Sequence, residues 1–261
     1  MEFKNKVVAI TGAAGGIGRE LCAYFGSEGA AIGAFDKSDA VMSFAEQLRG
    51  RGTRAQAAVV DISDASAVAS AFASVTSALG AIDILINNAG ATSHPSLEHT
   101  TPEGFSEDID VNLNGAYACA YAVLPAMKAR RQGTIVNIGS VNGLAALGDA
   151  AYSAGKAGLI SLTKALALEF GRYNIRSNVV CPGTVRTPIW NERISRNPKV
   201  LTELTRWYPL GRIVEPIEVI RAVAFLASDA ASAITGIVLP VDCGLTAGNI
   251  VMARELTLED F

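Results

Sequence analysis

The stretch Thr11-Gly12-Ala13-Ala14-Gly15-Gly16-Ile17-Gly18 decides the fold of this chain. Residues 6–10 before it form a short apolar run that is typical of a buried parallel strand, and residues 19–28 after it follow a helical pattern. A glycine turn between a strand and a helix is either a tight connection or an anion site, where backbone N–H groups and the helix dipole face a phosphate. The turn lacks the G-K-[ST] ending of a P-loop, and its spacing departs from G-x-G-x-x-G.

Strands and helices alternate along the rest of the chain. Further strands are expected at residues 30–35, 56–60, 82–86, 134–138, 175–180 and 237–241, with helices between them. This rhythm predicts one α/β domain over residues 1–261, with a Rossmann-type, doubly wound parallel sheet covered by helices on both faces. Right-handed crossovers would bring the carboxyl ends of all strands to one edge, where ligands bind in such folds.

Polar residues and glycines stand at these predicted strand ends. Asp36 follows the second strand, where dinucleotide-binding folds carry an acid for the ribose 2′-hydroxyl. A carboxylate there repels a 2′-phosphate and predicts NAD rather than NADP, although Asp36 or Ser38 also suits the N-cap of a helix through residue 49. The other ends carry Asp61-Ile62, Asn87-Asn88-Ala89-Gly90, Gly139-Ser140 and Cys181-Pro182-Gly183.

Tyr152 and Lys156 open a long helical pattern over residues 152–173. Four residues apart on a helix, they share one face, with Cβ atoms roughly 5–6 Å apart. A fixed ammonium favours the phenolate. Lowering the pKa of a phenol from about 10 to near 7 takes roughly 4 kcal/mol, however, which is more than one cation supplies. The pair therefore suits a site beside the positively charged ring of NAD⁺. Alone, this spacing also fits an ordinary helix surface.

Two candidate residues lie between these motifs. Thr101-Pro102-Glu103 has the chemistry of a helix start, and the helix is expected to run to residue 131 with Asn112 inside it. Because asparagine is a mediocre helix former, Asn112 is either a solvated side chain or a functional one. His94 precedes this helix in a predicted loop, as a surface residue or a substrate contact.

The alternation breaks in residues 185–215, called the flap segment below. It is rich in Trp, Pro and Arg and is expected to form a mobile flap over the site. Its charges are Arg186, Arg193, Arg196, Lys199, Arg206 and Arg212 against Glu192, Glu203 and Glu215. This basic character indicates either a solvated or subunit-contact face, or attraction of an anionic substrate by residues such as Arg193, with Trp190 stacking on it. The tail, residues 249–261, is expected to be irregular.

Composition excludes several classes of protein. The chain has 261 residues, half of them hydrophobic, and a net charge of -3, which argues against binding to nucleic acid or to a membrane surface. No apolar run approaches the 18 or so residues that span a bilayer. Scattered cysteines predict free thiols and a cytoplasmic protein, and two histidines leave little for a metal site.

The sequence closely resembles the short-chain dehydrogenase/reductase family over essentially its full length. The resemblance rests on the glycine stretch, Asp61-Ile62, Asn87-Asn88-Ala89-Gly90, Asn112, Ser140, Tyr152 with Lys156, Pro182-Gly183 and Val241-Asp242-Cys243-Gly244. Two positions depart from the family: the gap from Ser140 to Tyr152 is one residue shorter than in many members, and Cys243 stands where glycine is common.

The resemblance implies a role for each matching residue. Tyr152 would be the general acid and base, Lys156 would bind the nicotinamide ribose and lower the tyrosine pKa, and Ser140 would hold the substrate oxygen. Asn112 would hold a water in a proton relay. The cofactor would contact Gly12, Gly16, Ile17, Gly18, Asp36, Asp61, Ile62, Asn88, Ala89, Gly90, Pro182, Gly183, Val185 and Thr187, besides Tyr152 and Lys156.

The function expected from this resemblance is NAD-dependent hydride transfer at a secondary alcohol or carbonyl carbon. The substrate is expected to be a sugar, sugar acid or polyol, with Ser140, His94, Trp190 and Arg193 as candidate contacts. A lipophilic or steroid-like ketone is the alternative, and a non-catalytic NAD-binding scaffold is a remote one. The family also implies a homotetramer paired through helices 103–131 and 152–173.

Overall fold

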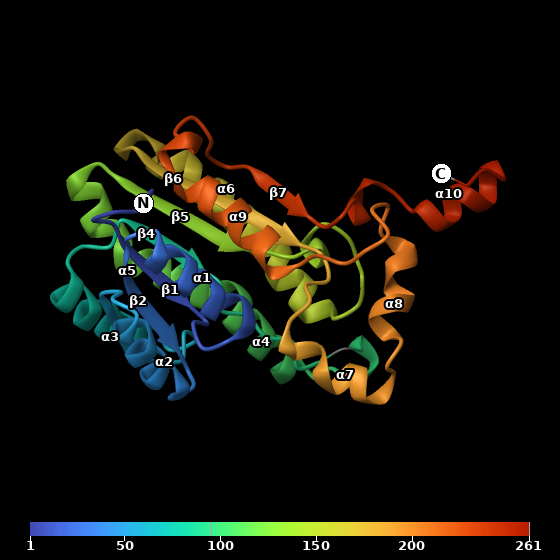
Figure 1. Cartoon of the computed structure of the whole chain (residues 1–261), viewed down its shortest axis with the longest axis horizontal. Helices are drawn as coiled ribbons and strands as arrows, with labels where there is room; N and C mark the ends of the chain where they lie inside the picture. The colour runs from blue at the N-terminus through green and yellow to red at the C-terminus, as the bar shows by residue number, and fades with distance from the viewer. Residues whose placement is uncertain (95, 261) are drawn as a thin grey trace.

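The computed structural model describes residues 1–94 and 96–260. Within them, a parallel sheet has the strand order β3-β2-β1-β4-β5-β6-β7 (Figure 1). Its strands are β1 (Val7–Thr11), β2 (Ala31–Asp36), β3 (Ala55–Val59), β4 (Ile84–Asn87), β5 (Gly133–Ile138), β6 (Ile175–Pro182) and β7 (Val238–Val241). The chain winds outward on both sides of β1, so the order reverses between β1 and β4. This confirms the predicted doubly wound α/β fold.

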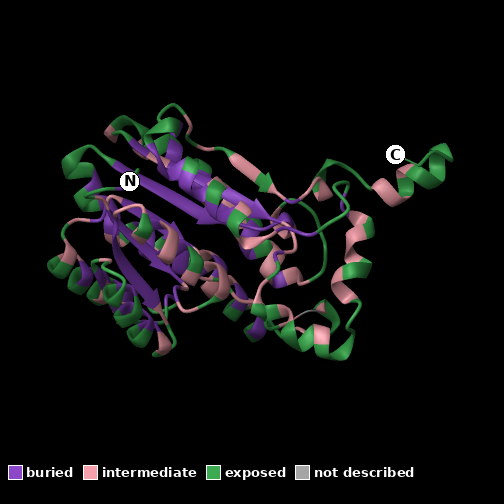
Figure 2. Ribbon diagram, viewed as in Figure 1, coloured by how far each residue is buried: buried purple, intermediate pink, exposed green. Residues whose placement is uncertain are grey.

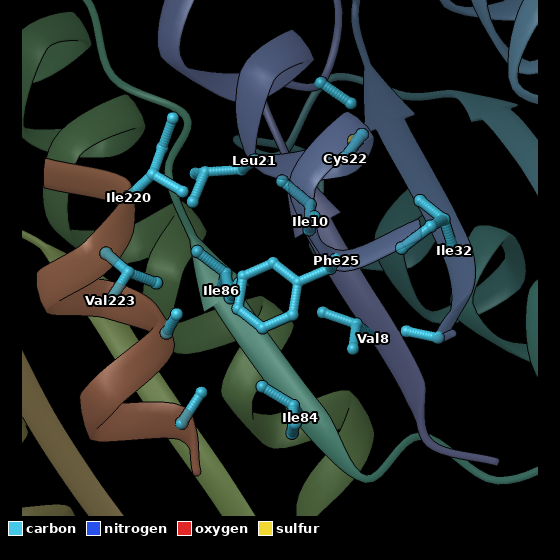
Figure 3. Packing of buried hydrophobic residues seen from close by; sticks show 14 of the residues in the cluster. Val8, Ile10, Leu21, Cys22, Phe25, Ile32, Ile84, Ile86, Ile220 and Val223 are labelled. Atoms are coloured by element: carbon cyan, nitrogen blue, oxygen red, sulfur yellow. The ribbon is translucent and has the colours of Figure 1, made fainter. Parts of the chain in front are cut away.

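Helices cover both faces because alternate strand residues point to opposite sides of the sheet. Val8 and Ile10 of β1 belong to one buried cluster and Val7 and Ala9 to the other. The first cluster is completed by α1 (Gly16–Ser27), α2 (Ala40–Gly50) and α9 (Pro216–Ala227), and the second by α3 (Ala65–Leu79), α5 (Gly115–Arg130) and α6 (Ala150–Phe170). Figure 3 shows Phe25 of α1 among strand residues and side chains of α9, and Figure 2 shows the strands as the buried centre.

The helix predicted over residues 103–131 forms, with one local change. Thr101 Oγ1 accepts a hydrogen bond from Gly104 N at 3.1 Å and caps α4 (Pro102–Ile109). A π-helical turn, Asp110–Asn114, then joins α4 to α5 without a break. Such turns insert one extra residue into a helix and occur often at functional sites. Asn112 lies at the centre of this turn.

The flap segment holds two short helices, α7 (Asn191–Arg196) and α8 (Val200–Leu204). Its ends meet in a β-bridge between Val185 and Val214, with Arg186 N donating to the Val214 carbonyl at 2.9 Å. The predicted irregular tail was wrong in part, because residues 250–257 form helix α10 (Ile250–Thr257), which extends away from the body (Figure 1). The capping oxygen of Asn249 accepts from Met252 N at 3.0 Å and stabilises its start. Among the described helices, none has the length and apolarity needed to cross a bilayer.

Candidate active site

A cavity of about 1250 Å³ lies at the carboxyl ends of the strands. All residues that the sequence predicted as cofactor contacts line it, from Gly12 in the glycine turn to Thr187 in the flap segment. Ser140, Tyr152 and Lys156 lie on the same wall, as do Trp190 and Arg193. Asn112 and His94 are not among the lining residues. The sheet edge therefore gathers nearly the whole predicted set in one place.

The glycine turn is packed so tightly that it excludes side chains. Gly12 has a positive φ of 65°, and a Cβ on Gly18 would lie 2.0 Å from the Gly12 carbonyl oxygen. A Cβ on Gly16 would lie 3.1 Å from Thr187 Cβ, which places the start of the flap segment against the turn. The turn leads directly into the N-terminus of α1. Free backbone N–H groups and an open surface at a helix N-terminus fit a pyrophosphate.

The ends of β1 and β4 are held together by side chain to backbone hydrogen bonds. Thr11 Oγ1 accepts from the backbone N–H groups of Asn88 and Ala89, both at 3.0 Å. Asn88 Nδ2 in turn donates to the Thr11 carbonyl at 2.9 Å. These bonds fix the glycine turn and the Asn88-Ala89-Gly90 segment side by side at the reversal of strand order. Thr11 was not singled out from the sequence, since a threonine at a strand end has no distinctive pattern.

Asp36 fixes the glycine turn as well as facing the cavity. One carboxylate oxygen accepts from Ala14 N at 2.8 Å and the other from Ser38 N at 2.9 Å. Helix α2 begins only after Asp39, so neither of the predicted capping residues, Asp36 and Ser38, is its N-cap. A carboxylate has about four acceptor positions, so Asp36 retains capacity for ribose hydroxyls. Further along the edge, hydrogen bonds from Ser63 lower the pKa of Asp61 and keep it ionised.

The predicted catalytic group comes from β5 and α6. Lys156 is 3% exposed, and its Nζ donates to the Ile138 carbonyl of β5 at 2.9 Å. The same Nζ lies 5.6 Å from the centroid of the Tyr152 ring, one turn earlier on α6. Ser140 lies two residues after the end of β5, and its hydroxyl accepts from Asn142 N at 3.1 Å. These bonds orient Lys156 and Ser140 in relation to the Tyr152 phenol.

Electrostatics at this group differ from the simple expectation. Burial raises the pKa of Tyr152, and a hydrogen bond with Ser140 opposes this rise. Burial also lowers the pKa of Lys156 to about 8, opposed by the nearby Cys181. The protein's own groups therefore do not bring the phenol to a neutral pKa. A cationic nicotinamide beside it is the group that would favour the phenolate.

Asn112 lies behind this group rather than on a solvated helix face. It is 1% exposed, and its Nδ2 donates to the Ala91 carbonyl at 2.6 Å and the Asp108 carbonyl at 2.8 Å. Its Oδ1 is buried with no partner among the described residues. A Cβ on Gly90 would approach both this oxygen, at 2.9 Å, and Lys156 Nζ, at 3.1 Å. A buried acceptor facing a lysine is a site at which a bound water satisfies both groups.

His94 takes a structural position outside the cavity wall. Its Nδ1 lies 3.6 Å from Asp108 Oδ2 of α4, and a Cβ on Gly104 would lie 2.5 Å from its Nε2. The ring therefore packs on the first turn of α4. It holds the loop after β4 against that helix, and its role as a substrate contact stays a prediction. Pro95, in the same predicted loop, lies outside the described residues.

Of the six basic residues in the flap segment, Arg193 alone lines the cavity. Its guanidinium stacks on the Trp190 ring at 4.9 Å. Three others form ion pairs with glutamates: Arg186 with Glu215, Arg196 with Glu192 and Arg212 with Glu218. The basic character read from the sequence is thus largely neutralised locally. The apolar side chains that line the cavity in this part include Leu144, Leu147, Ile189, Trp190, Leu204, Trp207 and Leu245.

Comparison with known proteins agrees with this geometry. Residues 12–246 match a family model described as enoyl-(acyl carrier protein) reductase. An uncharacterized oxidoreductase of Schizosaccharomyces pombe is 43% identical over 261 residues, covering all of this chain and 98% of that protein. A Burkholderia thailandensis oxidoreductase of the short-chain dehydrogenase/reductase family superposes with a TM-score of 0.92 at 48% identity and covers 98% of both chains.

Two further similar structures contain cofactors. A Brucella melitensis 3-oxoacyl-[acyl-carrier protein] reductase with bound NAD has a TM-score of 0.85 at 33% identity, covering 94% of this chain and 92% of that one. A Burkholderia cenocepacia gluconate 5-dehydrogenase in complex with NADP and tartrate has a TM-score of 0.88 at 33% identity, covering 95% and 98%.

The fold and the site define an oxidoreductase that uses a nicotinamide cofactor and a small-molecule substrate. The chain belongs to the short-chain dehydrogenase/reductase family.

Proposed function

We propose that this protein is an NAD-dependent dehydrogenase that interconverts a secondary alcohol and a carbonyl on a polyol, sugar or sugar acid. The observation that carries the proposal is the convergence of Ser140, Tyr152 and Lys156 on one cavity wall beside the glycine turn. When bound, the nicotinamide supplies the hydride acceptor or donor. The protein binds and orients the reactants and moves one proton.

Each polar group has a task that its position suits. The Ser140 hydroxyl, oriented by Asn142 N, holds the substrate oxygen. The Tyr152 phenol exchanges a proton with that oxygen, as a base in oxidation and an acid in reduction. Lys156, held on the Ile138 carbonyl, keeps a positive charge next to the phenol and offers donors to the nicotinamide ribose. Asn112 Oδ1, buried and unpartnered among the described residues, would receive the water that links Lys156 to solvent.

NAD is proposed over NADP because of Asp36. Its carboxylate is fixed in the cavity by Ala14 N and Ser38 N, at the end of β2. A 2′-phosphate at this position would face a negative charge without a matched cation, although Lys37 also lines the cavity. Similar structures contain either NAD or NADP, so this preference rests on the acid.

The substrate class is supported by the flap segment and by one relative. Arg193 stacked on Trp190 offers a cation and an aromatic face to a sugar acid, and a structure similar to this chain is a gluconate 5-dehydrogenase. A specific observation favours a second candidate, a lipophilic ketone. The cavity is also lined by Leu144, Leu147 and Trp207, which would pack against an apolar body.

We further infer that residues 1–261 act as one cofactor-binding and catalytic domain, with residues 185–215 as its substrate flap. The closed base of this segment at Val185 and Val214 supports the second part. A homotetramer is proposed from the exposed apolar surface of the paired helices, where Tyr121 on α5 is 66% and Leu168 on α6 is 85% exposed.

Tyr152→Phe tests the proposed chemistry. Removing the hydroxyl should lower kcat by about 10²- to 10⁴-fold, the range for a general acid or base, while NADH binding stays within a few-fold of the wild-type protein. The measurement is NADH formation from NAD⁺, and separately NADPH formation from NADP⁺, with sugars, sugar acids, polyols and lipophilic alcohols. Full activity in the variant would contradict the role of Tyr152, and a preference for NADP⁺ would contradict that of Asp36.

A further inference from the structure

One charged side chain in the cavity has no task in the proposed chemistry. Asp149 lines the cavity three residues before Tyr152, at the start of α6. Asp149 is the N-cap residue of α6 and Tyr152 is the third residue of that helix, and both line the cavity, so the carboxylate and the phenol face the same space. An acid beside a catalytic phenol hinders formation of the phenolate. Its presence therefore needs a reason other than acid–base chemistry.

Asp149 has the right chemistry for a helix cap but does not cap. Aspartate is among the preferred N-cap residues because its carboxylate accepts from N–H groups of the first turn. At Asp149 the side chain makes no such bond, and the backbone is left-handed, with φ 48° and ψ 63°. This conformation is unfavourable for most residues with a Cβ. The chain thus turns the carboxylate away from the helix to which it belongs.

The carboxylate is held at the cavity wall by one partner. Thr92 Oγ1 donates to Asp149 Oδ1 at 3.1 Å, and Thr92 lines the cavity too. The second oxygen has no partner among the described residues. The neighbouring amide of Asn142 does not serve it, because Asn142 Nδ2 donates to the Gly148 carbonyl at 3.1 Å and to Ser153 Oγ at 3.3 Å. The second carboxylate oxygen of Asp149 can therefore accept a hydrogen bond from a donor that enters the cavity.

We infer that Asp149 is a specificity-determining residue that accepts a hydrogen bond from a hydroxyl on the carbon next to the reacting carbon. This inference rests on the proposed function, because Ser140 and Tyr152 would place the reacting oxygen and Asp149 lines the same cavity three residues before Tyr152. The substrate is then a vicinal diol, or the corresponding α-hydroxyketone. A carboxylate or phosphate on that neighbouring carbon would face a like charge and be rejected. An acidic group on a more distant carbon of the substrate, near Arg193, would not be rejected by Asp149.

The test compares pairs of ketones that differ only in the neighbouring hydroxyl. Acetoin and butanone form a small pair, and benzoin and deoxybenzoin a large pair that suits the apolar wall. NADH-dependent reduction is measured as kcat/KM for wild-type protein, Asp149→Ala and Asp149→Asn, with α-ketobutyrate as the anionic probe. Asp39→Ala is the matched control, because Asp39 is also an N-cap residue without a capping hydrogen bond and does not line the cavity.

The wild-type protein should prefer the hydroxyketone of at least one pair by about 10-fold or more, the effect of one hydrogen bond to a charged acceptor. Asp149→Ala should remove this preference by slowing the hydroxyketone, with the plain ketone and NADH binding little changed. Asp149→Asn should raise the rate with α-ketobutyrate relative to acetoin, and Asp39→Ala should resemble the wild-type protein. NADH fluorescence on binding confirms that each variant is folded.

Three results would overturn the inference in different ways. If the wild-type protein reduces both ketones of a pair and Asp149→Ala slows them equally, Asp149 does not read the hydroxyl, while the proposed function stands. If the wild-type protein reduces none of the ketones but oxidises a sugar or polyol with NAD⁺, the inference fails and the proposed function stands; if it turns over neither panel although it binds NADH, both fail.

Discussion

Lys156 is a charge that the fold buries at a cost, and replacing it should make the protein more stable. Its side chain is 3% exposed, and burial lowers its pKa from 10.5 to about 8. In Lys156→Met a flexible apolar chain of similar length takes the place of the ammonium. The lysine keeps its charge because the site needs it, so the variant should lose activity while it gains stability.

The magnitude follows from the pKa. A lowering from 10.5 to about 8 means that folding disfavours the ammonium by about 3 kcal/mol, at about 1.4 kcal/mol for each pH unit. The native state binds fewer protons than the unfolded state between these values, so wild-type stability rises with pH across that window. The free-energy cost of burying the Lys156 ammonium is fully present below about pH 8 and nearly absent above pH 10.5. The lost bond to the Ile138 carbonyl offsets about 1 kcal/mol, leaving Lys156→Met about 2 kcal/mol more stable at neutral pH.

Urea unfolding of both proteins at neutral pH and at pH 10.5 measures this. The stability gain of Lys156→Met should be present at neutral pH and disappear at the higher pH. Lys164→Met is the matched control, since Lys164 is an exposed lysine on the same helix and should show no such change with pH. A Lys156→Met variant that is less stable at neutral pH, or whose stability difference does not depend on pH, would refute the reasoning.

Three further predictions concern the turn, a cap and the flap segment. Gly18→Ala places a Cβ 2.0 Å from the Gly12 carbonyl oxygen, so it should destabilise the protein by about 1–3 kcal/mol and weaken NADH binding. Thermal unfolding and NADH fluorescence measure the two effects, and unchanged values would contradict the tight packing of the turn. Asp64→Ala removes the acceptor for two N–H groups at the start of α3 and should cost about 1 kcal/mol in urea unfolding without altering NADH affinity. Arg193→Ala should raise KM for gluconate at least about 10-fold if Arg193 binds the carboxylate. Arg196 forms an ion pair and does not line the cavity, so Arg196→Ala should leave KM unchanged. Equal KM values in the two variants would argue against an anionic substrate.

The sheet and the cofactor edge could be predicted because each signal was local. Apolar runs that stop at a glycine, an aspartate or an asparagine mark buried strands and their ends, and the winding rules bring those ends together. Asp36 and Gly90 reach the same cavity for that reason. The Thr101 cap and Pro102 likewise predicted the start of α4 correctly.

What the sequence did not predict depends on contacts between distant segments. The π-helical turn at Asn112 has no propensity signal, because it follows from packing of α4 and α5 against α6. The flap arginines look like an anion site until their glutamate partners are placed, such as Glu218 beside Arg212. Asp149 was not singled out from the sequence, because its left-handed backbone and its contact with Thr92 are visible only in the structure.

The joined ends of the flap segment have a consequence for how this family can change. Because Val185 and Val214 form a β-bridge, the segment between them begins and ends at neighbouring points of the body. The entropy of closing such a loop depends only weakly on its length. Thr187 packs against Gly16 and Tyr208 against Gly183, so these two residues of the segment belong with the nucleotide half. The stretch between them, which holds α7 and α8, can be lengthened, shortened or exchanged between relatives while the nucleotide half is kept, and it is the part of the segment through which the choice of substrate can change.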